Sequence, residues 1–134
     1  IIPVHITQTP SPDLVVSSLS VPNVGFAGQP VWVKFTVTNI GKAPENISSW
    51  RDAVFLSSNN IVDGGDIVLQ TYTRTGILNT GASYTDSVLA FLPAASAGNY
   101  YIIFKADAYN AIYETTEDNN TASSVIFIMQ NLML

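Results

Sequence analysis

The chain has 134 residues, a formal net charge of −5 and no cysteine. This length suits one domain with a sizeable core, and the lack of cysteine excludes disulfides, thiol catalysis and thiolate metal sites. The negative charge disfavours nucleic acid as a partner, and no apolar stretch approaches the ~20 residues of a membrane-spanning helix, so direct membrane insertion is not expected.

Short runs of strand-forming residues, bounded by Gly, Pro, Asn and Ser, recur along the chain, and helical periodicity is missing. The predicted strands span residues 13–20, 31–38, 50–56, 67–73, 83–91, 98–107 and 125–129. The clearest is 31–38, where apolar odd positions alternate with even positions that include Trp32 and Lys34. The pattern predicts an all-β fold, an immunoglobulin-like two-sheet β-sandwich of about seven strands.

Alternation also predicts the core of this sandwich. The expected core residues are Val33, Phe35, Val37, Trp50, Val54, Leu56, Ile102 and Phe104. Tyr100 follows Gly98 at the start of the sixth strand, where a tyrosine corner is expected, and Ile102 then occupies the position of a disulfide cysteine in antibody domains. The alternative is that Tyr100 is an ordinary strand aromatic.

The two ends of the chain resemble each other. Residues 4–8 match residues 126–130 at two of five positions, with an offset of 122 residues. A repeat of this length predicts tandem copies, joined by a stiff linker such as Thr-Pro-Ser-Pro at 9–12, and chance is the rival explanation of so short a match. We therefore expect a linker or repeat remnant at 1–11, the sandwich at 12–130 and a tail at 131–134.

The runs together resemble the CARDB family, the cell-adhesion-related domain of bacteria and archaea. The resemblance rests on residues 12–16, 27–29, 31–39, 50–57, 63–66, 98–101, 106–107 and 114–120. It implies a non-catalytic, immunoglobulin-like module of secreted or cell-surface proteins, often present in several copies, with a presumed role in adhesion. Neighbouring domains of the same chain are the expected partners, together with a surface glycan or protein. The family supplies no ligand-defining residues to carry over.

Trp32 departs from this resemblance, because similar sequences have a small polar residue there. It is expected to be an exposed aromatic contact or to be covered by a neighbouring domain or loop. The alternative function is that of a carbohydrate-binding accessory module. Such a module would need several aromatic faces on one surface. The candidates are Trp32, Tyr72, Tyr84, Tyr109 and Tyr113, of which Tyr109 and Tyr113 form the best pair. Burial of most of these tyrosines is the competing interpretation.

Catalysis is not expected. The only histidine is His5, in the segment that resembles another copy's last strand, so a Ser–His–acid arrangement is unsupported. Residues 81–85 lack the second glycine of a nucleophile elbow. The acid pairs at 63/66 and 114/117 are loop acids without an aromatic-lined cleft.

Calcium binding is the sharper hypothesis, because calcium takes six to eight oxygen ligands from loops rich in Asp, Asn and carbonyl groups. In the first polar loop the candidates are Asn60, Asp63 and Asp66, and Asp52 could add a carboxylate. In the second loop they are Glu117 and Asp118, to which Asp107 could contribute. Ordinary turn chemistry explains the same residues without metal, and no other cofactor is expected.

Overall fold

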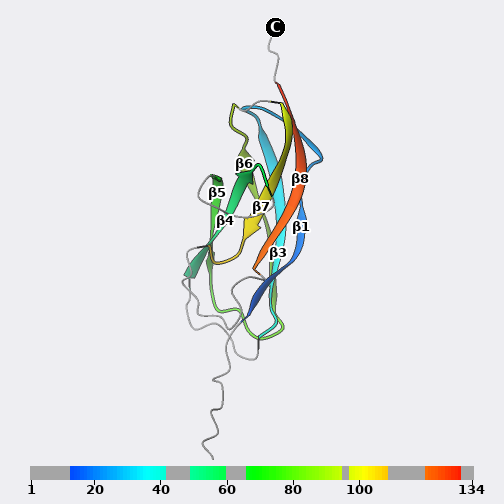
Figure 1. Cartoon of the computed structure of the whole chain (residues 1–134). Helices are drawn as coiled ribbons and strands as arrows, with labels where there is room; N and C mark the ends of the chain where they lie inside the picture. Colours follow the sequence, from blue (N-terminus) through cyan, green and yellow to red (C-terminus); the bar gives the residue numbers. More distant parts are fainter. Residues whose placement is uncertain (1–12, 42–48, 60–65, 95–96, 109–119, 131–134) are drawn as a thin grey trace, which may run out of the picture.

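Eight β-strands form two sheets in the computed structural model, which describes residues 13–41, 49–59, 66–94, 97–108 and 120–130. The strands are β1 (Leu14–Ser20), β2 (Val24–Phe26), β3 (Pro30–Asn39), β4 (Ser49–Ser57), β5 (Ile67–Thr75), β6 (Ser83–Phe91), β7 (Gly98–Lys105) and β8 (Thr121–Met129). One sheet has the order β1–β3–β6 and the other β2–β8–β7–β4–β5 (Figure 1). These described ranges contain no helix with the length and hydropathy needed to cross a membrane. The predicted all-β two-sheet sandwich is confirmed.

β3 is the central strand of the three-stranded sheet, and its residues alternate strictly between the two faces of that sheet. Val31, Val33, Phe35 and Val37 are buried, and the intervening Lys34 is exposed. Because successive side chains of a strand point to opposite faces, one face of β3 lies on the core and the other meets solvent. β3 pairs antiparallel with β1 on one side and with β6 on the other.

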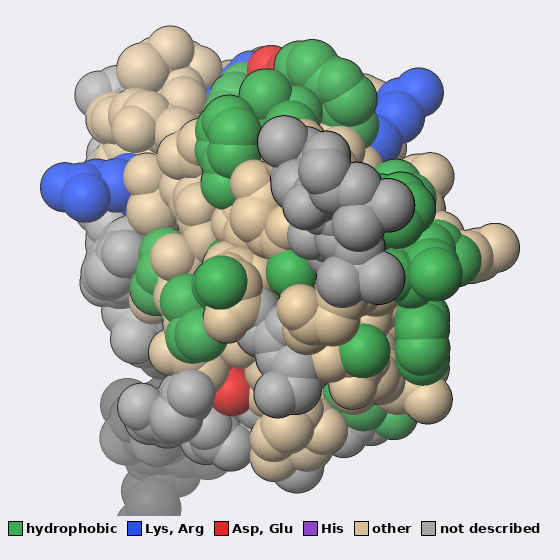
Figure 2. Space-filling model, turned by 90° about the horizontal axis from the view of Figure 1, so that it is seen from above, with side chains coloured by type: hydrophobic (Ala, Val, Ile, Leu, Met, Phe, Trp, Pro, Cys, Tyr) green, Lys and Arg blue, Asp and Glu red, His purple; other side chains and the backbone are tan. Residues whose placement is uncertain are grey.

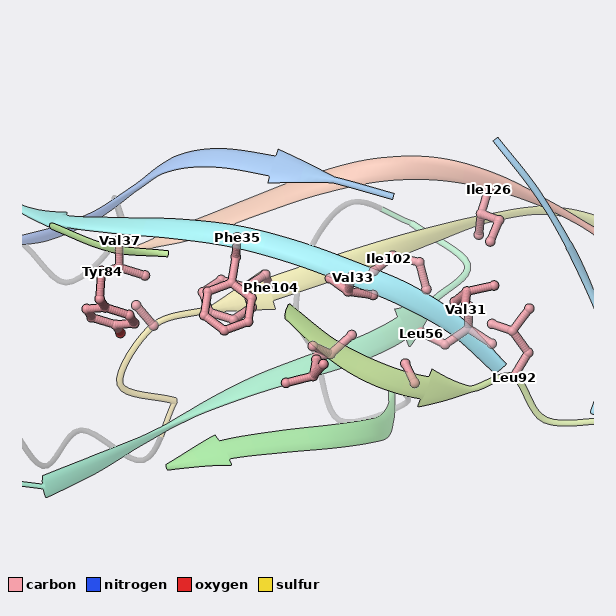
Figure 3. Packing of buried hydrophobic residues seen from close by; sticks show 14 of the residues in the cluster. Val31, Val33, Phe35, Val37, Leu56, Tyr84, Leu92, Ile102, Phe104 and Ile126 are labelled. Carbon is pink, nitrogen blue, oxygen red and sulfur yellow. The ribbon is translucent and has the colours of Figure 1, made fainter. Parts of the chain in front are cut away.

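Apolar side chains of both sheets meet in one layer between them, as Figure 3 shows. Phe35 of β3 stacks on Phe104 of β7 with ring centroids 4.1 Å apart. All eight residues that alternation places in the core are buried, which confirms that prediction. Tyr100 is half-buried against the core, and its role as a tyrosine corner stays a prediction.

β2 is a strand that the sequence did not predict, and it accounts for eight strands instead of about seven. It pairs parallel with the end of β8, so that Phe26 lies beside Met129. Its inward residue is Gly25, where an added Cβ would come within 2.6 Å of Leu92 Cδ1. A contact that short means that the end of the Leu92 side chain would have to shift for any larger residue at position 25, so glycine lets β2 approach the core without displacing it.

The strands run along the long axis, so the two ends of the sandwich form distinct poles (Figure 1). At the lower pole, where β1 begins, Asp13 N–H donates to Asn39 Oδ1 (3.0 Å). At the upper pole, where β8 ends, Ala27 N–H donates to the Met129 carbonyl (2.9 Å). The described chain therefore begins at one pole and ends at the other. The predicted domain limits at residues 12 and 130 stay predictions.

Candidate functional site

A fully buried carboxylate lies between the sheets near the lower pole. Asp52 of β4 follows the inward parity of Trp50 and Val54, and its side chain has no exposed surface. The Tyr84 hydroxyl donates to Asp52 Oδ2 (2.6 Å), and Asp107 N–H donates to Oδ1 (2.9 Å). Each carboxylate oxygen therefore accepts a hydrogen bond, as a buried acid requires.

Tyr84 makes this group a link between the sheets. It belongs to β6 of the three-stranded sheet, whereas Asp52 belongs to β4 of the five-stranded sheet. Trp50 Nε1–H also donates to the Tyr84 hydroxyl (3.3 Å), and the Arg74 guanidinium carbon lies 4.7 Å from the centroid of the Tyr84 ring. The hydrogen bonds among Asp52, Tyr84 and Trp50 fix the relative position of the strands that they join.

Burial shifts the protonation equilibria of this site. It raises the pKa of Asp52 to about 6, although the hydrogen bonds from Tyr84 and Asp107 N–H work in the opposite direction. Burial and the Asp52 charge also raise the pKa of Tyr84. Because the Asp52 side chain has no exposed surface, it cannot touch a substrate, and we assign it a structural role.

This pKa gives the stability of the fold a specific pH dependence. The folded state binds the Asp52 proton more tightly than the unfolded chain does, because in the unfolded chain the pKa of this carboxyl has its ordinary value of 3.8. The stabilisation is therefore complete below about pH 4 and is lost as the pH rises through about 6. From pH 4 to 7, we expect the unfolding free energy of the parent chain to fall by about 2 kcal/mol relative to that of Asp52→Asn. Urea unfolding of both proteins checks this, and a constant difference would contradict it.

Most of the metal ligands proposed from the sequence lie outside the described residues. These are Asn60, Asp63, Glu117 and Asp118. Asp66 is described and half-buried directly before β5. Within the described ranges, no three His, Cys, Asp or Glu side chains converge on a common point.

The grouping of Asp52 with the first polar loop is wrong. In the pairing of β4 with β5, Asp52 lies opposite Tyr72 and Leu56 lies opposite Ile67, the residue after Asp66. A strand rises about 3.3 Å per residue, so Asp52 and Asp66 are separated along the ladder by roughly 17 Å. The structure instead places Asp52 against Asp107, the residue that the sequence assigned to the second loop.

Two oxygen-bearing side chains flank segment 109–119. Asp107 is buried, with a positive φ of 49°, and lies just before the segment. Asn120 is buried just after it, and its Nδ2–H donates to the Ala106 carbonyl (2.6 Å). The Oδ1 atom of Asn120 is buried and has no hydrogen-bond partner among the residues that the structure describes. A buried oxygen without a partner is costly, so this atom is an exception among buried polar groups.

The predicted aromatic contacts have different outcomes. Trp32 is 60% exposed on the outer face of β3, as its parity predicts. Tyr72 and Tyr84 instead point into the sandwich, where both contact the ring of Phe35. The assignment of Tyr84 to a sugar-binding surface is therefore wrong, because its ring is buried, whereas Tyr72 is half-buried and its hydroxyl bonds to Asp86 at the surface. Tyr109 and Tyr113 lie outside the described residues.

Comparison with known proteins supports the family resemblance. The sequence profile of CARDB matches residues 11–124. The chain belongs to the CARDB family. A crystal structure of a CARDB domain from Pyrococcus furiosus, in complex with di-metal ions, has a TM-score of 0.66 and 20% identity, covering 93% of this chain and all (100%) of that one.

Two further structures show where similar domains occur. A domain of a candidate cell surface protein from Methanosarcina acetivorans has 26% identity and a TM-score of 0.63, covering 89% of this CARDB chain and 93% of that one. The β-glucosidase 3B from Thermotoga neapolitana, in complex with alpha-D-glucose, has 16% identity and a TM-score of 0.58, covering 87% of this chain but 16% of the enzyme. The likeness to the enzyme thus concerns a small part of it. No curated protein matches the sequence significantly.

Proposed function

We propose that this CARDB domain is a non-catalytic structural module of a secreted or cell-surface protein, which spaces or presents the domains next to it. The observation that carries the proposal is the path of the described chain, from the start of β1 at the lower pole to the end of β8 at the upper pole (Figure 1). A domain with this path can be placed in series and separates its neighbours by its own length. The similar domain in a candidate cell surface protein supports the location.

The interior of the module suits a load-bearing spacer. The ladders join β1, β3 and β6 in one sheet, and the Tyr84–Asp52 hydrogen bond connects that sheet to the other. A fully buried, fully bonded acid gives stiffness and offers no group for reaction with a substrate. The role in adhesion stays a further proposal, with Trp32 as the exposed contact.

Exchange of the module tests the spacer function. In the protein that carries it, residues 12–130 would be replaced by an unrelated β-sandwich of similar length whose ends also lie at opposite poles. Because a spacer acts through length and stiffness, we expect the activity of the neighbouring domains or the attachment of the cell to be retained. The opposite outcome is loss of activity when the module is exchanged, together with the same loss when Trp32→Thr is made in the natural module. These two results would show that the module functions through a specific contact.

The carbohydrate-binding alternative gains little support from the structure. Among the Trp and Tyr side chains that the structure describes, Trp32 alone is exposed. Sugar-binding surfaces of the kind considered above need at least two such faces. Glycan-array binding by the purified chain that is lost in Trp32→Thr would restore this alternative.

We also propose that calcium binds at the second polar loop. The observation that favours it is the buried, unpartnered Oδ1 of Asn120 beside the buried Asp107. Glu117 and Asp118 would complete the oxygen set that calcium prefers. The similar domain from Pyrococcus furiosus was solved with di-metal ions, which supports a metal in this fold. Bound calcium would neutralise the carboxylates and tie the two ends of the loop together.

Calcium should therefore raise the melting temperature of the chain. A ligand present at about 100 times its Kd stabilises a folded protein by about 2.7 kcal/mol, which corresponds to roughly 5–10 °C for a domain of this size. Calorimetry with calcium and with EDTA measures the shift. Glu117→Gln should abolish the shift, whereas Asp63→Asn in the first loop serves as the matched control and should keep it. Equal melting temperatures with calcium and EDTA would refute the site.

A further inference from the structure

An apolar patch covers the outer face of β2 and the second half of β8. Val24 and Phe26 of β2 lie opposite Phe127 and Met129 of β8, and Val125 precedes Phe127 by two residues on the same face. All five side chains are exposed, Phe26 at 46% and Phe127 at 39%, because the alternate residues of both strands point into the core. We call these five residues the β2–β8 patch.

The patch lies at the edge of the five-stranded sheet. β2 is the edge strand, and neither β2 (VGF) nor β8 (TASSVIFIM) contains a charged residue. Soluble proteins protect their sheet edges with very short edge strands, charges, proline, bulges or a covering segment, and β2 is short but carries no charge. In the view onto the upper pole, hydrophobic side chains gather in several groups and charged ones are few (Figure 2). An apolar edge without charges is best explained by a partner that covers it.

The position of the patch points to the next module in the chain. Met129 belongs to the patch, and Gln130, the last described residue, follows it directly. With the 122-residue offset seen in the sequence, the counterpart of Asp13 in a following copy would be residue 135. Five peptide steps from Gln130 reach at most about 18 Å, so that copy would lie within reach of the patch.

The lower pole offers the complementary surface. Ile40 and Ile77 are exposed there, at 57% and 60%. Asn39 connects the two turns that carry these isoleucines to the start of β1. Its Oδ1 accepts from Asp13 N–H, and its Nδ2–H donates to the carbonyl of Leu78, the residue after Ile77 (3.1 Å). A following copy would thus bring two exposed isoleucines toward the β2–β8 patch.

We propose that the β2–β8 patch binds the lower pole of a second copy of this module, the one that follows it in the chain. This proposal rests on the proposed spacer function and adds that the array is stiff. The contact is head-to-tail, since different surfaces of the two copies meet. A short linker gives an effective concentration in the millimolar range, so that a small apolar interface is enough to hold the copies together.

A tandem protein tests the proposal. It joins residues 1–134 directly to residues 13–134 of a second copy, which keeps the 122-residue offset. Each copy is isotopically labelled in turn by segmental ligation, and NMR relaxation is measured for both. We expect one shared rotational correlation time, with chemical-shift changes in β2 and β8 of the first copy and around Ile40 and Ile77 of the second.

Copy-specific variants supply the control. Phe26→Thr with Phe127→Thr in the first copy should abolish the shared tumbling and the shift changes. The same pair in the second copy should leave both unchanged, because no module follows that copy. Trp32→Thr in the first copy, on the outer face of the other sheet, should also leave them unchanged. Melting curves of the single chain show whether the variants fold.

Three results would overturn the proposal. In the first, the two copies of the parent tandem tumble independently. In the second, the double substitution of Phe26 and Phe127 has the same effect in either copy. In the third, the tandem forms oligomers that grow with protein concentration, while its two linked copies do not contact each other. The second result indicates contact between two β2–β8 patches, and the third a partner in another molecule. None of them bears on the exchange experiment, which tests the spacer function separately.

Discussion

Phe35→Ala is expected to lower the free energy of unfolding by about 4 kcal/mol, because it leaves a cavity where the two sheets meet. The Phe35 side chain is fully buried and stacks on Phe104, with centroids 4.1 Å apart. Two further rings form T-shaped pairs with it, Tyr72 with a centroid distance of 5.3 Å and Tyr84 with one of 6.4 Å. Three rings cannot all move into the space that is left, so most of the lost contact remains lost. Urea unfolding of the variant and the parent chain measures the change.

Phe91→Ala is the matched control, since Phe91 is 58% exposed at the end of β6. The same chemical change on the surface should cost less than about 1 kcal/mol. If both variants lost the same stability, the layer around Phe35 would not be the core that holds the sheets together.

Tyr84→Phe is expected to cost about 2–3 kcal/mol while the ring keeps its packing. The lost hydroxyl donates to Asp52 Oδ2 and accepts from Trp50 Nε1–H, so two buried polar atoms each lose a hydrogen bond. Because the hydrogen bond from Tyr84 lowers the pKa of Asp52, its removal should also raise that pKa above about 6. The loss of stability on going from pH 4 to 7 should then be steeper in the variant than in the parent chain.

Tyr72→Phe provides the comparison for this prediction. Its hydroxyl also donates to a carboxylate, Asp86 Oδ2 at 2.8 Å, but that pair lies at the surface. The hydroxyl can bond to water in exchange, so we expect a cost below about 1 kcal/mol and an unchanged pH profile. Similar costs for the two tyrosines would indicate that the link between the sheets contributes little.

Alternation in the sequence predicted the strands whose one face is continuously apolar. β3 is the best case, since four apolar residues at odd positions fix both its existence and its inner face. β8 was predicted from residue 125 only, although it begins at Thr121, because Ala122 to Ser124 show no apolar alternation. β2 was missed because three residues with a central glycine carry no pattern and its partner is distant in sequence.

The buried acid was less accessible to sequence reasoning. A signal was present, since Asp52 falls on the inward parity between Trp50 and Val54. Its partners depend on topology, because Tyr84 and Asp107 lie on other strands and meet Asp52 only after both sheets have formed. Closeness in sequence instead favoured grouping Asp52 with the first polar loop. The register of β4 and β5 places Asp66, the described residue of that loop, too far from Asp52 along the sheet.

A distance between the two poles tests the central claim, that the module carries the chain from one end of the sandwich to the other. Because the chain has no cysteine, Asp13→Cys and Gln130→Cys allow specific spin labelling. Along the strand direction, the two sites are separated by about the length of β3, which spans nine residue steps of about 3.3 Å each. Pulsed EPR should therefore give one narrow distance of about 30 Å. A distance below about 20 Å would place both ends at one pole and contradict a module built in series.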